Sequence, residues 1–99
     1  MKVIIENGNP VVAHLQGRLD TAASVEVTPD FQSLADQAAE HIILDCTELE
    51  YISSSGLRLF LSLRKASAAK GGKLQVRNIN SDIRQVFMMT GFISLFEIL

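Results

Sequence analysis

A short apolar run near the middle of the chain, His41–Cys46 (HIILDC), lies between two segments with helical periodicity. Its β-branched residues and its length are typical of a strand that is buried on both faces of a sheet. Before it, Thr28-Pro29-Asp30 forms a helix-start signal, and apolar residues then recur at helical spacing, which predicts a helix from about residue 29 to about 39. After it, apolar positions again repeat as in a helix, up to Lys70-Gly71-Gly72. Because helical crossovers join parallel strands, this order favours a sheet with parallel neighbours and helices packed against it.

The flanking segments complete this pattern. Val3–Ile5 and the strand beginning at Val11 flank the turn Asn7–Pro10, which predicts an antiparallel hairpin. Residues 73–77 alternate polar and apolar, as in a strand with one buried face, and Asn80 or Ser81 then caps a third helix. The third helix has a predicted inward face of four residues and ends at Gly91, and a short last strand can follow; the four residues are Ile83, Val86, Phe87 and Thr90. We therefore expect an α/β fold in one domain, residues 1–99, with a small mixed β-sheet and helices packed against it.

Composition excludes several classes of partner and site. Nine basic and eleven acidic residues give a net charge of −2, without a basic cluster that could follow a phosphate backbone, so no nucleic-acid partner is predicted. Cys46 is the single cysteine, which excludes an intrachain disulfide and favours a buried free thiol. No segment resembles a signal peptide or a membrane span. We expect a cytoplasmic protein without membrane insertion, bound metal or cofactor.

Three consecutive serines precede the second helix, and helical geometry separates their roles. Ser53 projects toward the apolar side and is the candidate N-cap. Ser55 lies on the same side as Arg58, Ser62 and Lys65, so it is predicted to face solvent. Ser54 falls at the border between the two sides and has no assigned role. Capping alone explains one or two serines, and a special role for Ser55 is the alternative.

The start of this helix also carries Gly56, which costs about 1 kcal/mol of helix propensity relative to alanine. Its presence predicts that another backbone approaches closely there. The apolar arc of the helix is wider than one sheet face requires, so part of it is expected to contact a neighbouring helix or a partner; its members are Leu57, Leu59, Phe60, Leu61 and Leu63.

No catalytic motif links these serines to a base, so the chain is not predicted to be an enzyme. His14 and His41 both belong to predicted strands, and SSSG is not the Gly-x-Ser-x-Gly elbow of hydrolases. Gly71-Gly72-Lys73 lacks the rest of a phosphate-binding loop.

Three segments in order resemble STAS domains, the sulfate-transporter and anti-sigma-factor-antagonist family. LDCTELEYISSSGLRLFLSLRKASAAKGGKL resembles the core signature of the family, with Ser53 at a position where the family often has Asp. LQGRLDTAAS is similar to the second strand and its Gly-x-Leu-Asp turn, and VFMMTGFISLFEI is similar to the closing helix. The resemblance extends from about Val11 to the C-terminus and implies the STAS (anti-sigma factor antagonist-like) fold.

In function, the resemblance implies a partner-switching regulator. In such members, an anti-sigma factor that is also a serine kinase of the GHKL class binds the unmodified domain, and a PP2C-type serine phosphatase removes the phosphate that the kinase adds. The phosphorylated serine corresponds to Ser55. The implied partner-binding residues are Asp20, Thr21, Ser53, Ser54, Ser55, Gly56, Leu57, Arg58, Leu61 and Ser62.

Two alternatives remain open. The resemblance places the turn Gly17–Ser24 beside the serine turn, and Asp20 in it can be a direct partner contact or the N-cap of a short first helix. The whole domain can instead resemble the accessory STAS subunits that dock on lipid-transport ABC ATPases without phosphorylation.

Overall fold

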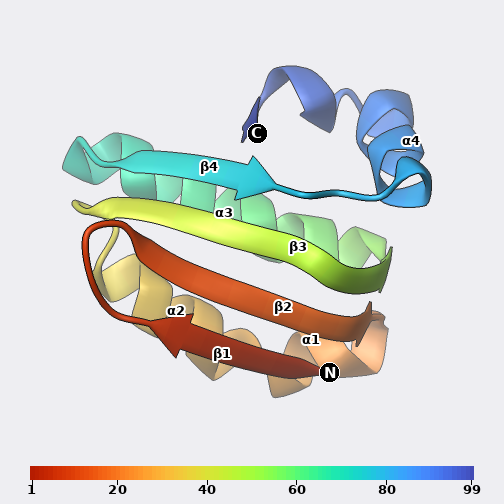
Figure 1. Ribbon diagram of the computed structural model, residues 1–99, viewed down its shortest axis with the longest axis horizontal. Helices are drawn as coiled ribbons and strands as arrows, with labels where there is room; N and C mark the ends of the chain where they lie inside the picture. The colour runs from red at the N-terminus through yellow and green to blue at the C-terminus, as the bar shows by residue number, and fades with distance from the viewer.

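A computed structural model describes all 99 residues (Figure 1). The elements, in chain order, are β1 (Lys2–Glu6), β2 (Val11–Leu19), α1 (Thr21–Glu26), α2 (Thr28–Asp36), β3 (His41–Ile52), α3 (Ser54–Lys70), β4 (Lys73–Arg77), α4 (Ser81–Thr90), a 3₁₀ turn (Phe92–Ser94) and β5 (Glu97–Ile98). The predicted α/β fold with a mixed sheet is confirmed.

The five strands form one sheet in the order β1-β2-β3-β4-β5. The β1–β2 hairpin is antiparallel, and the three other pairs are parallel. In Figure 1, α1, α2 and α3 lie behind the sheet, so the face toward the viewer carries no helix. We call this the open face; its side chains include His14, Asp45 and Gln75, whereas Leu15 and Leu44 on the same strands belong to the core on the helix side.

A cluster of phenylalanines fills the core between the sheet and the helices. The ring of Phe60 on α3 lies 5.9 Å from Phe31, 6.1 Å from Phe87 and 6.2 Å from Phe96, measured between centroids. These rings come from α2, α3, α4 and the C-terminal segment. The ring of Phe60 therefore holds α3 against α2, α4 and the C-terminal segment. The serine run lies at the start of this helix.

Element boundaries differ from the sequence prediction in a few places. β3 continues to Ile52, beyond the predicted end at Cys46, because Leu49 and Ile52 keep packing into the core opposite the long β2. The helix predicted to reach residue 39 ends at Asp36. Thr90, predicted to face inward, is exposed, and its hydroxyl donates to the carbonyl of Val86.

Several predicted boundaries are confirmed. The β1–β2 hairpin and the short last strand both form. Asn80 caps α4 by accepting a hydrogen bond from the backbone of Ile83 at 2.8 Å. Gly71 and Gly91 end α3 and α4 in the left-handed conformation, which residues without a side chain adopt at little cost.

Candidate functional site

The turns after β2 and β3 meet at one edge of the sheet. Leu19 and Ile52, the last residues of these parallel strands, are register partners. The backbone N–H of Ser53 donates to the carbonyl of Leu19 at 2.8 Å, which connects the two turns directly. Parallel strands place their carboxyl ends at the same edge, where α/β folds commonly bind ligands. The fold therefore brings the Asp20–Ser24 and Ser53–Gly56 segments together, as the resemblance implies.

In each turn, one side chain caps the N-terminus of the helix that follows. Ser53 Oγ accepts a hydrogen bond from the Gly56 N–H at 3.2 Å, and the residue is only 8% exposed. Its predicted role as the N-cap of α3 is confirmed. Asp20 Oδ1 accepts from the Ala23 N–H at 2.8 Å, so the capping role of Asp20 is also observed. Asp20 itself is exposed, and it can cap α1 and still contact a partner.

The first turn of α3 packs tightly onto the two strands. A Cβ atom at Gly56 would lie 2.7 Å from Leu19 Cγ and 3.0 Å from Ile52 Cγ1. The predicted close approach is present, but side chains make it, not the predicted backbone, because these large residues end the two strands beneath the helix. Leu57 is 6% exposed and packs into the core. Gly56 and Leu57 therefore position the helix and present little side-chain surface to a partner.

The other predicted contact residues differ in accessibility. Arg58, Ser62 and Lys65 are exposed, which confirms that α3 has a polar outer side, and Ser54 is exposed as well. Ser55 is half-buried, which corrects the prediction that it faces solvent freely. Ser54 is the more exposed of these two hydroxyl-bearing residues.

Two further predicted contact residues border the same region. Thr21 is exposed in the first turn of α1, and its carbonyl accepts a hydrogen bond from Ser24 Oγ at 2.7 Å. Leu61 is half-buried on α3. Thr21 can therefore offer its side chain to a partner, and Leu61 only part of its own.

A groove between α2 and α3 begins beside this surface. It has a volume of about 310 Å³ and is lined by Thr28, Phe31, Gln32, Ala35, Leu59, Ser62 and Leu63. The sequence predicts that part of the wide apolar arc of α3 contacts a neighbouring helix, and Leu59 faces α2 across this groove. The groove itself has no signal in the sequence, since periodicity along one helix does not reveal the gap between two.

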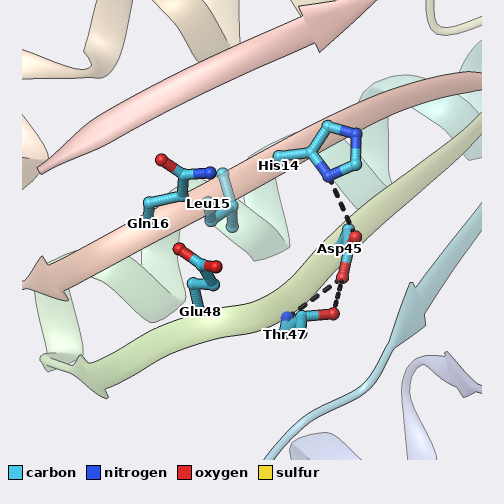
Figure 2. A pocket seen from close by; sticks show the side chains of 6 residues that line it. All are labelled: His14, Leu15, Gln16, Asp45, Thr47 and Glu48. Atoms are coloured by element: carbon cyan, nitrogen blue, oxygen red, sulfur yellow. Dashed lines mark hydrogen bonds and ion pairs between the residues drawn. The ribbon is translucent and has the colours of Figure 1, made fainter.

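A second, polar site lies on the open face (Figure 2). It is a shallow pocket of about 170 Å³, lined by His14, Leu15, Gln16, Asp45, Thr47 and Glu48. His14 Nδ1 lies 2.9 Å from Asp45 Oδ2, and Arg77 Nη2 donates to the same oxygen at 3.4 Å. Asp45 Oδ1 accepts from both the backbone N–H and the hydroxyl of Thr47. Sequence reasoning missed this cluster, although an aspartate inside the apolar run HIILDC was a signal for it.

These contacts determine the ionisation of Asp45. Burial alone would raise the pKa of its carboxyl group, but the hydrogen bonds from Thr47 and Arg77, and the charge of Arg77, outweigh burial and lower the pKa to about 2. Asp45 is therefore a carboxylate near neutral pH and a poor proton acceptor. Burial, with the nearby charge of Asp45, raises the pKa of the Cys46 thiol to about 12, so this predicted buried thiol stays protonated.

The two sites lie on opposite faces of the sheet. Figure 2 shows His14 and Asp45 in front of the strands, whereas α3, which carries Ser55, lies behind them in Figure 1. His14 and Asp45 are thus not on the same face as Ser55, as a nucleophilic triad would require.

The side chains of His, Cys, Asp and Glu form no group of three or more that could hold a metal ion. None of the four helices has the length and the apolar sequence that a membrane span needs.

Known proteins resemble this chain in sequence and in fold. BtrV of Bordetella bronchiseptica, which bears the name of an anti-sigma factor antagonist, is 31% identical over 88 residues, covering 89% of this chain and 76% of BtrV. The anti-sigma F factor antagonist of Paenibacillus polymyxa is 29% identical over 90 residues, with the same coverage of 89% and 76%. The structure of the Bacillus cell fate determinant SpoIIAA in the phosphorylated form superposes with a TM-score of 0.73 and 25% identity, covering 99% of this chain and 91% of SpoIIAA.

The family model of the STAS domain matches residues 1–99. The fold shared with SpoIIAA and the names of the relatives agree with this match. The chain therefore belongs to the STAS domain family, and two of its relatives there are named as anti-sigma factor antagonists.

Proposed function

We propose that this chain is a cytoplasmic anti-sigma factor antagonist that works by partner switching. With Ser55 unmodified, it binds an anti-sigma factor that is also a serine kinase of the GHKL class. Phosphorylation of Ser55 ends the complex, and a PP2C-type phosphatase restores the binding form. The observation that carries the proposal is the position of Ser55 beside Gly56, in the first turn of a helix whose outer side is polar and exposed.

The relatives support the coarser part of this proposal. Two of them are named as antagonists of anti-sigma factors, and one solved structure is of SpoIIAA in its phosphorylated form. The departure from the family pattern at position 53 does not remove the cap, because Ser53 accepts the hydrogen bond from the Gly56 N–H that an aspartate could accept.

The start of α3 is electrostatically suited to a phosphate. The first helical N–H groups lack partners within the helix and, with the helix dipole, favour an anion. Arg58 is exposed one turn further along. A phosphoserine carries a charge of about −1.5 to −2 near neutral pH, which these groups can balance in the free domain.

The kinase step needs no catalytic group from this chain. The hydroxyl oxygen of Ser55 attacks the γ-phosphorus of ATP held by the partner, the bond from that phosphorus to ADP breaks, and the hydroxyl proton passes to a base of the partner. Because Ser55 is half-buried, the partner must contact the surrounding surface closely to reach it. We assign this surface to the exposed residues Asp20, Thr21, Ser54, Arg58 and Ser62, with Leu61 at its border.

The added phosphate then opposes binding. In the complex it would be removed from water at a surface that the partner contacts closely, and an unpaired buried charge costs several kcal/mol. A loss of about 3 kcal/mol weakens binding roughly 100-fold. The switch therefore acts at the contact surface and does not require α3 to unfold.

Mass spectrometry and calorimetry test the proposal. The anti-sigma factor kinase from the same organism, incubated with ATP and this protein, should add one phosphate to Ser55 and none to the Ser55→Ala variant. Calorimetry should show that Ser55→Asp weakens kinase binding about 100-fold, while Ser33→Ala, which removes an exposed hydroxyl on α2 outside this surface, keeps both binding and phosphorylation. Phosphate on another residue, or equal affinity for the parent and Ser55→Asp, contradicts the proposal.

Copurification tests the alternative partner. If this protein copurified with a transporter ATPase in place of a kinase, the ABC-transporter alternative would be favoured.

A further inference from the structure

The first strand has an unpaired edge. β1 is the outermost strand of the sheet and pairs only with β2, as Figure 1 shows at the N-terminal end of the chain. Alternate residues of an edge strand point their N–H and C=O groups away from the sheet, where another strand can pair with them. Ile4, at the centre of β1, is 38% exposed and is one of the few large apolar residues on the surface. This edge combines free backbone groups with an exposed apolar side chain.

The sequence of β1 is complementary to itself about Ile4. Lys2, Ile4 and Glu6 project from the open face, because Ile4 and His14 are register partners and His14 lies on that face. If two copies of β1 pair antiparallel with Ile4 opposite Ile4, Lys2 of each copy faces Glu6 of the other. Val3 then lies opposite Ile5 on the helix side of the sheet. Every cross-strand pair in this register is apolar with apolar or positive with negative, as favourable pairing requires.

We infer that β1 is the contact by which two copies of this chain associate into a dimer with one continuous sheet. The symmetry axis is perpendicular to the sheet, so both helix layers lie on the same side. Val3 and Ile5, which are half-buried against the core, gain cover from their counterparts. Glu6 already contacts His14, yet its side chain is 66% exposed, which leaves it accessible to the lysine of a second copy. This inference does not rest on the proposed function, because it uses no residue of α3.

A five-residue strand pair is a small contact. Stable protein interfaces usually bury more than about 1,000 Å², which one such pair does not reach alone. The dimer should therefore be weak, with a dissociation constant of roughly 10–1,000 μM. Both ion pairs lie on an exposed face, so added salt should weaken association.

Charge reversal at the two ends of β1 tests the register. Sedimentation equilibrium should show the parent dimerising with concentration. Lys2→Glu turns both cross-strand pairs into pairs of like charge and should weaken the dimer about tenfold or more. Glu6→Lys should do the same. The double variant, Lys2→Glu with Glu6→Lys, restores opposite charges at both places and should dimerise again, close to the parent.

Controls separate this contact from general charge effects. Lys65→Glu repeats the charge change of Lys2→Glu on the exposed side of α3 and should leave dimerisation unchanged. The double variant still lacks the carboxylate of Glu6 beside His14, so its recovery would come from the restored pairing and not from that contact. Circular dichroism establishes that each variant is folded. A folded parent that stays monomeric up to about 1 mM overturns the inference, as does a double variant no better than the single ones. Kinase binding by a monomeric protein would leave the proposed function intact.

Discussion

Polar side chains have different structural roles on the two faces of the sheet. On the helix side, Ser53 and Asp20 use their oxygens to cap helices. On the open face, Asp45 connects three strands through His14, Arg77 and Thr47. The first set holds the candidate site in place, and the second stabilises the sheet on which that site is built.

Asp45 makes stability depend on pH in the acidic range. Its pKa is about 2 in the folded protein against an ordinary value of 3.8, so the carboxylate favours folding above the unfolded pKa, and this contribution is lost as pH falls through about 4 to 2. The shift corresponds to about 2 kcal/mol. We expect Asp45→Asn to lower the free energy of unfolding near pH 7 and to show a smaller loss than the parent on acidification to pH 2. Urea titrations at several pH values measure both effects.

The matched control is Asp36→Asn, which changes an exposed carboxylate at the end of α2. It should leave the slope of stability against pH nearly as in the parent. If Asp45→Asn and Asp36→Asn gave the same pH profile, the hydrogen bonds around Asp45 would not be the cause of the acid sensitivity.

At the scale of elements, the close seating of α3 on β2 and β3 depends on Gly56. A methyl group there would meet Leu19 Cγ at 2.7 Å, and Leu19 is fully buried and cannot swing away. Overpacking a core position costs about 1–3 kcal/mol, which exceeds the gain of up to about 1 kcal/mol in helix propensity. We therefore predict that Gly56→Ala lowers the free energy of unfolding by about 1–2 kcal/mol, measured by urea denaturation.

A second variant identifies the clash as the cause. Leu19→Ala alone creates a cavity and is destabilising by about 2–5 kcal/mol. In that background, Gly56→Ala places its methyl group into the vacated space, so its cost should shrink or change sign. If Gly56→Ala cost the same in both backgrounds, its methyl group would not meet Leu19, and the explanation from crowding would be wrong.

The sequence predicts elements well where local chemistry determines them. Caps at Ser53 and Asn80 and the left-handed glycines after α3 and α4 need only neighbouring residues, and they are found as expected. The predicted end of β3 is wrong, because its last residues alternate with polar ones and are held by pairing with β2, which is distant in sequence. The predicted exposure of Ser55 is too high, because periodicity gives the side of the helix on which a residue lies and not its contacts with other elements.

The sequence predicts the candidate site unevenly. The pairing of the two turns follows from the family resemblance, and the structure brings them together through Ser53 and Leu19. The Asp45 cluster is not predicted, since His14, Asp45 and Arg77 come from three strands and meet only when the sheet register is known. The parts of the site that the sequence does not predict depend mostly on contacts between residues that are distant in sequence. Local sequence patterns do not reveal such contacts.

For the whole molecule, the proposed switch at Ser55 would separate partner binding from folding. The phenylalanine core and the sheet are formed by residues other than Ser54 and Ser55, so a charge added at the first turn of α3 need not disturb them. It also lies at the helix end that favours anions. A switch of this kind changes one patch of surface and leaves the rest of the domain folded.

Replacement of Ser55 by aspartate tests this separation without any partner. We predict that Ser55→Asp unfolds in one cooperative transition, with a melting temperature within about 4 °C of the parent, since a change of about 1 kcal/mol shifts a domain of this size by roughly that much. Amide chemical shifts in NMR spectra should change around residues 53–59 and 19–24 and remain as in the parent in β4 and α4. Ser54→Asp, one position earlier on the same helix, is the matched control for an added charge. Loss of cooperativity, or shift changes spread through the core, would show that charge at Ser55 acts by loosening the fold, and the surface mechanism would then be wrong.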